Sequence, residues 1–188
     1  MKTEFYTRIL ENPIIAAVTD MEKLKDARSS PCEIIFLLAG NVFNIREAVN
    51  SIRQVNKLVY VHLDLLEGLS KDNTAVDYLY KSITPDGIIT TKSNLIKHAK
   101  EIGMFTIQRL FLLDSLAVES GIKTVNNCKP DAVEIMPGIM NKVTAKISKE
   151  LKIPVIAGGL INEKEDVISC LNAGAMGISA SNEDVWYM

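Results

Sequence analysis

Two segments near the end of the chain each join an apolar run to small or polar residues that suit anion binding. They read IPVIAGGLI at 153–161 and MGISASN at 176–182. Glycine lets an anion approach the backbone closely, and N–H groups at the start of a helix are unpaired and partially positive. We therefore predict that Gly158, Gly159, Ser181 and Asn182 bind a phosphate group, with ordinary turn formation as the alternative.

Two charged residues lie within runs that otherwise resemble a protein core. Arg109 lies in IQRLFLLD at 107–114, and Glu134 lies in AVEIMPG at 132–138. A guanidinium binds phosphate or carboxylate through its planar fork, and a buried charge needs a partner. The pattern predicts either ligand binding by Arg109 and Glu134 or a structural ion pair between them, and the two interpretations are compatible.

His62 and Asp64 alternate with apolar residues in VHLDLL at 61–66. If this segment is a strand, both side chains fall on one face. That arrangement suits a catalytic base with its orienting carboxylate, or a ligand site, and equally a histidine satisfied within a barrel wall. The spacing offers no further metal-like ligands, so no metal is predicted.

Three further polar segments follow apolar runs. Lys92, in TTKSN at 90–94, is a candidate for binding an anionic ligand, while Ser93 or Asn94 caps the next helix; a surface cation is the alternative. Asp20 is expected to cap a helix, and Gly40 with the following asparagine is expected to form a turn.

Short aliphatic runs alternate with amphipathic stretches, and this alternation predicts the elements that position these residues. Eight strands are predicted, at 14–18, 33–39, 58–63, 87–90, 104–107, 132–135, 155–157 and 175–180. Eight such units predict an α/β fold, a compact TIM-type (β/α)8 barrel that forms a single domain over residues 1–188. In this fold, ligands bind at the carboxyl ends of the strands, and the loops after the seventh and eighth strands commonly hold phosphate.

The end of the chain leaves little room for the last covering helix. Only residues 181–188 follow the eighth predicted strand, so that helix is expected to be truncated, with Trp186 as its apolar anchor. A flank covered so thinly is consistent with a homo-oligomer, in the simplest case a homodimer.

The composition limits the classes of function. The 188 residues are 47% hydrophobic, and 21 basic against 23 acidic side chains give a formal net charge of −2, so no strong global field attracts nucleic acid. Three widely spaced cysteines and the lack of a secretory or membrane-spanning run predict a cytoplasmic protein with reduced thiols and no membrane partner. P-loop, dinucleotide-binding, zinc-protease and nucleophile-elbow motifs are absent, and predicted strands six and seven carry no lysine for a Schiff base.

Several long segments together resemble one known family, that of the glycerol uptake operon antiterminators. They are VHLDL at 61–65, GIITTKSN at 87–94, IQRLFLLD at 107–114, EIMPG at 134–138, IPVIAGGLI at 153–161, and Ser181-Asn182 with Trp186. The resemblance implies a regulator that senses glycerol 3-phosphate and acts on leader mRNA to prevent premature termination of transcription of glycerol-utilisation genes. It implies an effector ligand, no cofactor and no catalytic turnover.

Two other classes remain open from the residues alone. An isomerase, lyase or hydrolase of a small phosphorylated substrate would use Glu134 or His62 as acid or base, with Lys92 or Arg109 stabilising charge. A metabolic binding protein with a protein partner is the third class. No RNP-type aromatic motif or arginine-rich tract marks an RNA surface, and the best local cations either bind RNA or decorate solvated helices. They are Lys142, Lys146, Lys149, Lys152, Lys92, Lys97 and Lys100.

Overall fold

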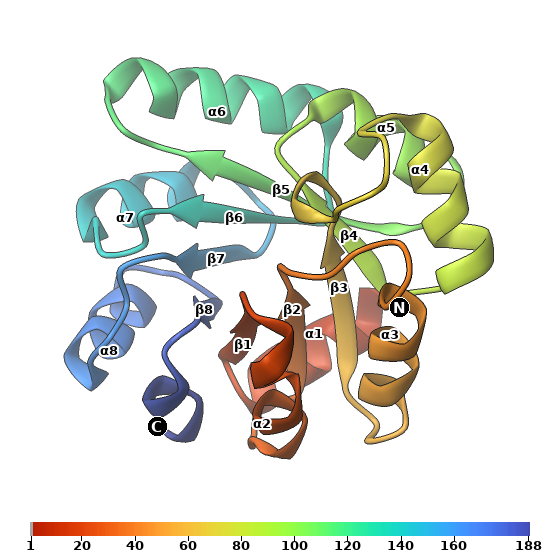
Figure 1. Cartoon of the computed structure of the whole chain (residues 1–188). Helices are drawn as coiled ribbons and strands as arrows, with labels where there is room; N and C mark the ends of the chain where they lie inside the picture. The colour runs from red at the N-terminus through yellow and green to blue at the C-terminus, as the bar shows by residue number, and fades with distance from the viewer. Residues whose placement is uncertain (1) are drawn as a thin grey trace.

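The computed structural model describes residues 2–188, in which eight parallel strands form a closed barrel (Figure 1). The strands follow one another around the barrel in chain order, and the eighth pairs with the first. The predicted TIM-type (β/α)8 fold and its eight strands are confirmed. The strands are β1 (Ile14–Val18), β2 (Ile34–Leu37), β3 (Leu58–His62), β4 (Gly87–Thr90), β5 (Phe105–Phe111), β6 (Ala132–Met136), β7 (Val155–Gly158) and β8 (Gly177–Ala180).

Strand β5 extends four residues beyond its predicted end at Ile107. It continues to Phe111 because Arg109, Leu110 and Phe111 pair in register with the end of β6. The extension places Arg109 in the barrel wall, directly beside Glu134, rather than in the following loop.

Two of the helices that cover the outside of the barrel begin at an aspartate that caps the first turn. Asp72 accepts a hydrogen bond from the Ala75 N–H at 3.0 Å, and Asp114 accepts one from the Ala117 N–H at 2.7 Å. No helix within residues 2–188 is long and apolar enough to cross a bilayer. The outer helices are α2 (Leu24–Ser29), α3 (Ile45–Arg53), α4 (Asn73–Tyr78), which continues as a π-helical segment to Ile83, α5 (Ser93–Glu101), α6 (Ser115–Cys128), α7 (Asn141–Glu150) and α8 (Lys164–Asn172).

An additional helix that the sequence analysis did not predict, α1 (Lys2–Glu11), closes one end of the barrel. Figure 1 shows it behind the ring of strands. Phe5 and Ile9 on this helix are buried and belong to the same apolar cluster as the amino-terminal ends of the strands. The Phe5 ring lies 4.8 Å from that of Phe105 and 5.5 Å from that of Tyr60, measured between centroids. The amino-terminal half of the barrel is therefore filled with apolar side chains and closed by α1.

Two inward-facing glycines make room for this packing. A Cβ atom at Gly177 would lie 2.5 Å from Ile9 Cδ1, and one at Gly87 would lie 2.8 Å from the Tyr60 ring. Neither glycine has a positive φ, so space rather than backbone conformation excludes a larger residue.

The segment after β8 forms a short 3-10 helix, η4 (Glu183–Tyr187), and Trp186 is its buried apolar anchor, as predicted. Figure 1 shows this segment between α8 and α2. Trp186 is fully buried, and its indole N–H donates to the Ala180 carbonyl at 2.8 Å. A single large side chain thus covers the flank that a full helix would otherwise cover.

We predict that Ile9 and Gly177 are energetically coupled. Ile9→Ala alone should lower the free energy of unfolding by about 2–5 kcal/mol through cavity formation. Gly177→Ala alone should lower it by about 1–3 kcal/mol through overpacking. In the double variant the new methyl group enters the space left by Ile9, so the loss should be smaller than the sum. Urea unfolding of the four proteins measures this coupling, and strict additivity would show that α1 does not pack against β8.

Candidate functional site

The carboxyl-terminal end of the barrel interior is polar, in contrast to the end closed by α1. Side chains alternate along a strand, so residues two positions after inward-facing Tyr60 and Ile107 also face inward. These residues are His62 and Arg109, and the same alternation brings Glu134 to this level on β6. Their exposed fractions are 2%, 6% and 1%. Three polar side chains predicted from separate segments are therefore together at one end of the barrel.

Arg109 and Glu134 form the ion pair that the sequence analysis proposed. Arg109 Nε donates to Glu134 Oε2 at 2.7 Å, while Arg109 Nη2 is buried without a partner within residues 2–188. The other carboxylate oxygen lies beside Gly158, where a Cβ atom would be only 2.9 Å away from it. Gly158 thus makes room for the carboxylate, and this negative charge disfavours an anion at that glycine.

His62 and Asp64 do not form the base-and-orienter pair that was one interpretation of their spacing. The strand ends at His62, so the alternation is lost before Asp64. Asp64 accepts hydrogen bonds from Thr90 Oγ1 at 2.9 Å, and from Thr91 N and Oγ1 at 2.7 and 2.8 Å. Burial alone would raise the pKa of this carboxyl, but these hydrogen bonds hold its pKa below the usual value. Asp64 therefore fixes the loop after β4.

Both ring nitrogens of His62 are buried and lack a partner within residues 2–188. Burial lowers the pKa of His62 from 6.5 to about 4, and the positive charge of Arg109 adds to this effect, although Asp64 opposes it. The imidazole is therefore neutral near pH 7, with one N–H donor and one acceptor nitrogen.

Lys92 lies away from this polar cluster. Its side chain is exposed, and Nζ donates to the Lys71 carbonyl at 3.2 Å, which corresponds to the surface-cation alternative. Lys92 is also the residue that precedes α5, so the predicted capping of this helix by Ser93 or Asn94 is wrong. The capping by Asp20 is confirmed, since its carboxylate accepts from the Glu22 N–H at 3.0 Å.

A cavity of about 110 Å³ opens above the ion pair. It is lined by both charged residues and by the ends of β1, β2 and β6 to β8, including Gly159 and Ser181. Within residues 2–188, the backbone N–H groups of Gly159, Leu160 and Ser181 donate no hydrogen bond to the protein. Gly159 has φ +78°, the left-handed region that favours glycine. This mouth of the barrel brings unpaired N–H donors and a free guanidinium nitrogen to one small cavity.

Two neighbouring groups define the limits of this cavity. The start of α8 is already capped, since Asp166 accepts from the Asn162 and Glu163 N–H groups at 3.0 and 3.1 Å. Asn182 accepts from the Asp184 N–H at 3.1 Å and donates to the Asn162 carbonyl at 3.3 Å, which ties η4 to the loop after β7. Of the four predicted phosphate residues, Gly159 and Ser181 line the cavity. Gly158 instead makes room for the Glu134 carboxylate, and Asn182 ties η4 to the loop after β7.

Sequence analysis missed Ser179, which is 4% exposed and lines the same cavity. The alternation of side chains along β8 could have identified it. Gly177, Ser179 and Ser181 share the inward face, while Ile178 and Ala180 point outward.

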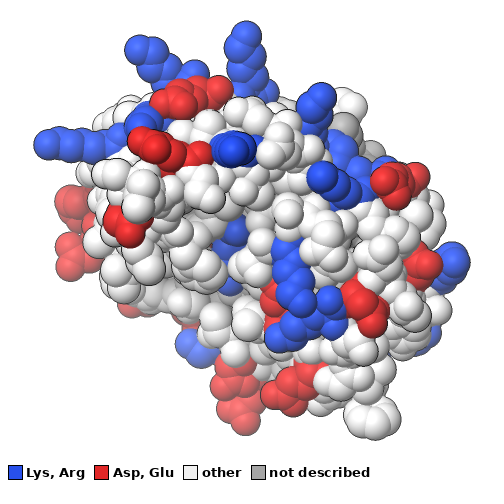
Figure 2. Space-filling model, turned by 90° about the horizontal axis from the view of Figure 1, so that it is seen from above, with Lys and Arg blue, Asp and Glu red and all other residues white. Residues whose placement is uncertain are grey.

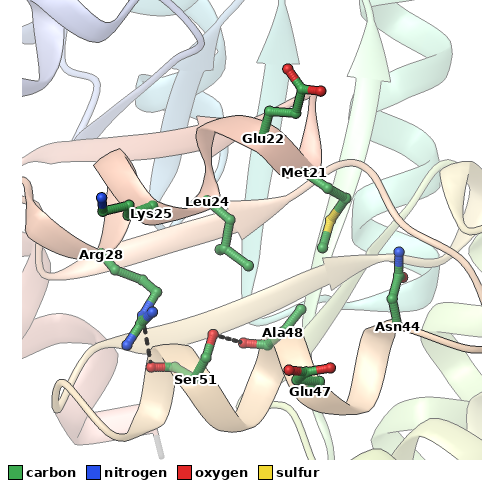
Figure 3. A pocket seen from close by; sticks show the side chains of 9 residues that line it. All are labelled: Met21, Glu22, Leu24, Lys25, Arg28, Asn44, Glu47, Ala48 and Ser51. Carbon is green, nitrogen blue, oxygen red and sulfur yellow. Dashed lines mark hydrogen bonds between the residues drawn. The ribbon is translucent and has the colours of Figure 1, made fainter.

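A larger cavity of about 300 Å³ lies elsewhere, between α2 and α3 (Figure 3). Its Arg28 side chain is directed at Ser51, and Nε donates to the Ser51 carbonyl at 3.0 Å. The other lining side chains include Met21 and Leu24, so the groove is partly apolar. It lies outside the strand ends and holds no buried polar atom without a partner within the described residues, so it is a weaker candidate than the barrel mouth.

Comparison with known proteins decides the family. The chain matches the family described as "Glycerol-3-phosphate responsive antiterminator" over residues 14–186. The chain belongs to this family. The match extends from the first residue of β1 to Trp186, so the strands and the barrel mouth lie within the family region, while α1 lies outside it. The resemblance inferred from the sequence is confirmed.

Individual relatives agree with this assignment. The crystal structure of a glycerol uptake operon antiterminator regulatory protein from Listeria monocytogenes is 35% identical, with a TM-score of 0.90, covering 93% of this chain and 95% of that one. A glycerol uptake operon antiterminator-related protein from Thermotoga maritima is 33% identical, with a TM-score of 0.83 and coverages of 93% and 98%. The uncharacterized protein YgcP of Escherichia coli strain K12 is 39% identical over 176 residues, which are 94% of this chain and 92% of that protein.

The low pKa of His62 predicts a pH-dependent stability in this family member. The unfolded state binds a proton near pH 6.5 and the folded state only near pH 4, so the free energy of unfolding falls as the pH falls through this window. The full loss, reached below pH 4, is about 3 kcal/mol. Urea unfolding from pH 7 to pH 4 should show a weaker dependence in His62→Gln than in the unmodified chain.

A direct titration provides the control. The chain has two histidines, so His98→Gln leaves His62 as the single imidazole for NMR. Its resonance should titrate near pH 4, and a midpoint near pH 6.5 would contradict this account of the His62 environment.

Proposed function

We propose that this protein senses glycerol 3-phosphate at the mouth of its barrel and thereby controls an antitermination activity on leader mRNA of glycerol-utilisation genes. The observation that carries the proposal is the cavity lined by Arg109, Gly159 and Ser181, because Arg109 Nη2 and the N–H groups of the other two residues have no hydrogen-bond partner within residues 2–188. Such groups suit a phosphate, because an anion satisfies several unpaired donors at once. The family description, which names glycerol 3-phosphate, supports this compound as the phosphate ester.

We infer a binding role rather than turnover of the ligand. His62 has no hydrogen-bonded carboxylate to orient it, and Glu134 is engaged by Arg109, so neither residue is arranged as a general acid or base. A regulator needs only a ligand affinity that differs between two states of the protein. No cofactor is needed for this role, and a cytoplasmic location follows from an action on nascent transcripts.

We propose the exposed lysine face of α7 as the RNA-binding surface. Lys142, Lys146 and Lys149 are spaced by four and three residues, so they share one side of the helix, while Thr144 and Ile147 are buried on the other. No ion pair within residues 2–188 involves these three lysines, whereas Lys23 and Lys100 are paired with carboxylates. The view in Figure 2 shows basic and acidic side chains interspersed, without one continuous basic field. A homodimer would bring two α7 faces to one RNA.

We predict that Gly159→Val weakens binding of glycerol 3-phosphate about tenfold or more. A side chain there would lie within 2.8 Å of Met136 Cε and would occupy the cavity. The matched control is Gly103→Val, because Gly103 has a similar φ of +83° but open space around it. Both variants should lose stability, and the control should keep its affinity.

Phosphorus NMR titration with glycerol 3-phosphate measures binding and turnover together. Selective broadening of the glycerol 3-phosphate resonance without a new resonance supports a sensor. A product resonance would show that the protein is an enzyme. Equal affinity in the two glycine variants would remove the loop after β7 from the site.

For RNA, replacing Lys142, Lys146 and Lys149 together by Gln should weaken retention of leader RNA and lower the slope of log affinity against log salt concentration by up to about 3. The control replaces three exposed lysines on other helices, Lys25, Lys123 and Lys164, and so makes the same change in net charge. Equal losses in the two triple variants would exclude α7 as the specific surface. Retention should also differ with and without glycerol 3-phosphate.

A further inference from the structure

We propose that His62 and Glu134 make the barrel mouth selective for a hydroxyl group beside the phosphate ester, so that the protein binds glycerol 3-phosphate and discriminates against its keto counterpart, dihydroxyacetone phosphate. The inference rests on the proposed function, because it assumes that glycerol 3-phosphate binds at this cavity. It adds which chemical feature of the ligand, besides the phosphate, the protein recognises and which side chains recognise it.

The first observation is that His62 is a buried polar side chain with no protein partner. At 2% exposure, neither ring nitrogen has a hydrogen bond within residues 2–188. Burying an unsatisfied donor or acceptor costs free energy, so native proteins rarely keep one without a reason. An apolar side chain of similar size would avoid this cost at a purely structural position.

The second observation is where this imidazole lies. It is at the carboxyl end of β3, in the same inward-facing layer as Leu38 and Arg109, which line the cavity. Burial is the main cause of the low pKa of His62, and the positive charge of Arg109 adds to it. His62 therefore belongs to the inward-facing polar layer of Arg109, directly behind the residues that line the cavity, and is not itself one of them.

The third observation is the unused hydrogen-bonding capacity of this cluster. Arg109 Nη2 offers a donor, and the neutral imidazole offers one donor and one acceptor. Glu134 Oε2 is bound by Arg109, whereas no hydrogen bond to Oε1 is present within residues 2–188. The cluster thus contains at least two acceptors without a hydrogen bond within residues 2–188, Glu134 Oε1 and one imidazole nitrogen.

A hydroxyl group matches this arrangement and a carbonyl group does not. A hydroxyl donates one hydrogen bond and also accepts, so it can satisfy both a carboxylate oxygen and an N–H group. A carbonyl oxygen only accepts, so it would leave unsatisfied the acceptor that the hydroxyl proton fills, and it would place its lone pairs against a carboxylate. Sites built to bind a hydroxyl reject analogues that lack it, because their own buried polar groups are then left unpaired.

The test compares glycerol 3-phosphate, dihydroxyacetone phosphate and inorganic phosphate by calorimetric titration. We expect the unmodified protein to bind the hydroxyl compound at least about tenfold more tightly than the keto compound. His62→Leu removes both ring nitrogens and should reduce the ratio of the two affinities toward one, mainly by weakening the binding of glycerol 3-phosphate. His62→Gln retains a donor and an acceptor and should recover part of the ratio.

Two controls separate recognition from structure. His62→Leu should fold at least as stably as the unmodified protein near pH 7, since it removes two buried unsatisfied atoms. His98→Gln is the matched control, because His98 is on α5 and bonds to Asp77 at 2.7 Å, away from the cavity; its ratio should be unchanged.

The outcomes distinguish this inference from the proposed function. Failure of the unmodified protein to bind glycerol 3-phosphate would overturn the proposed function and this inference with it. Tight binding of both esters with equal affinity would overturn the selectivity alone. If His62→Leu discriminates between the two esters as strongly as the unmodified protein, His62 has only a structural role and the inference is overturned.

Discussion

Pairing between β8 and β1 closes the sheet, and the arrangement of the interior depends on this closure. Ile14 and Ala16 are aligned with Ile178 and Ala180, which fixes the register around the ring. Once the ring is closed, every second residue of each strand must face inward. The interior therefore contains side chains from segments more than one hundred residues apart, such as His62 on β3 and Ser179 on β8.

The two ends of the barrel interior differ in polarity. At the amino-terminal end, α1 and the rings of Phe5, Tyr60 and Phe105 fill the space with apolar atoms, which contributes stability. At the other end, a buried ion pair and an unpartnered imidazole replace that packing, and both are costly unless satisfied. The closed end therefore contributes apolar packing, whereas the open end holds hydrogen-bonding groups that the protein leaves unused within residues 2–188.

The proposed sensor site joins elements across the barrel. Its cavity is lined from β1 and β2 on one side and from β5 to β8 on the other, and Asn182 links η4 to the loop after β7. Under this proposal, a phosphate ester held there would contact segments that the backbone connects only around the outside of the barrel. Its binding would shift an equilibrium between two states of the protein if these segments are arranged differently in the two states.

The sequence by itself determined the eight strands, the Asp20 cap and the buried Trp186 after the last strand, because these follow from local periodicity and capping preference. It offered the ion pair of Arg109 with Glu134 as one of two compatible interpretations, since buried charges need partners. It also carried the segments that identify the family. Only the tertiary structure decided that Lys92 is exposed and bonds to the Lys71 carbonyl, and that Asp64 accepts hydrogen bonds from the loop after β4. It also decided that Gly158 makes room for a carboxylate and that α1 closes the barrel. Side-chain direction at a strand end, and the space left beside a glycine, depend on neighbours distant in sequence, so no local pattern contains them.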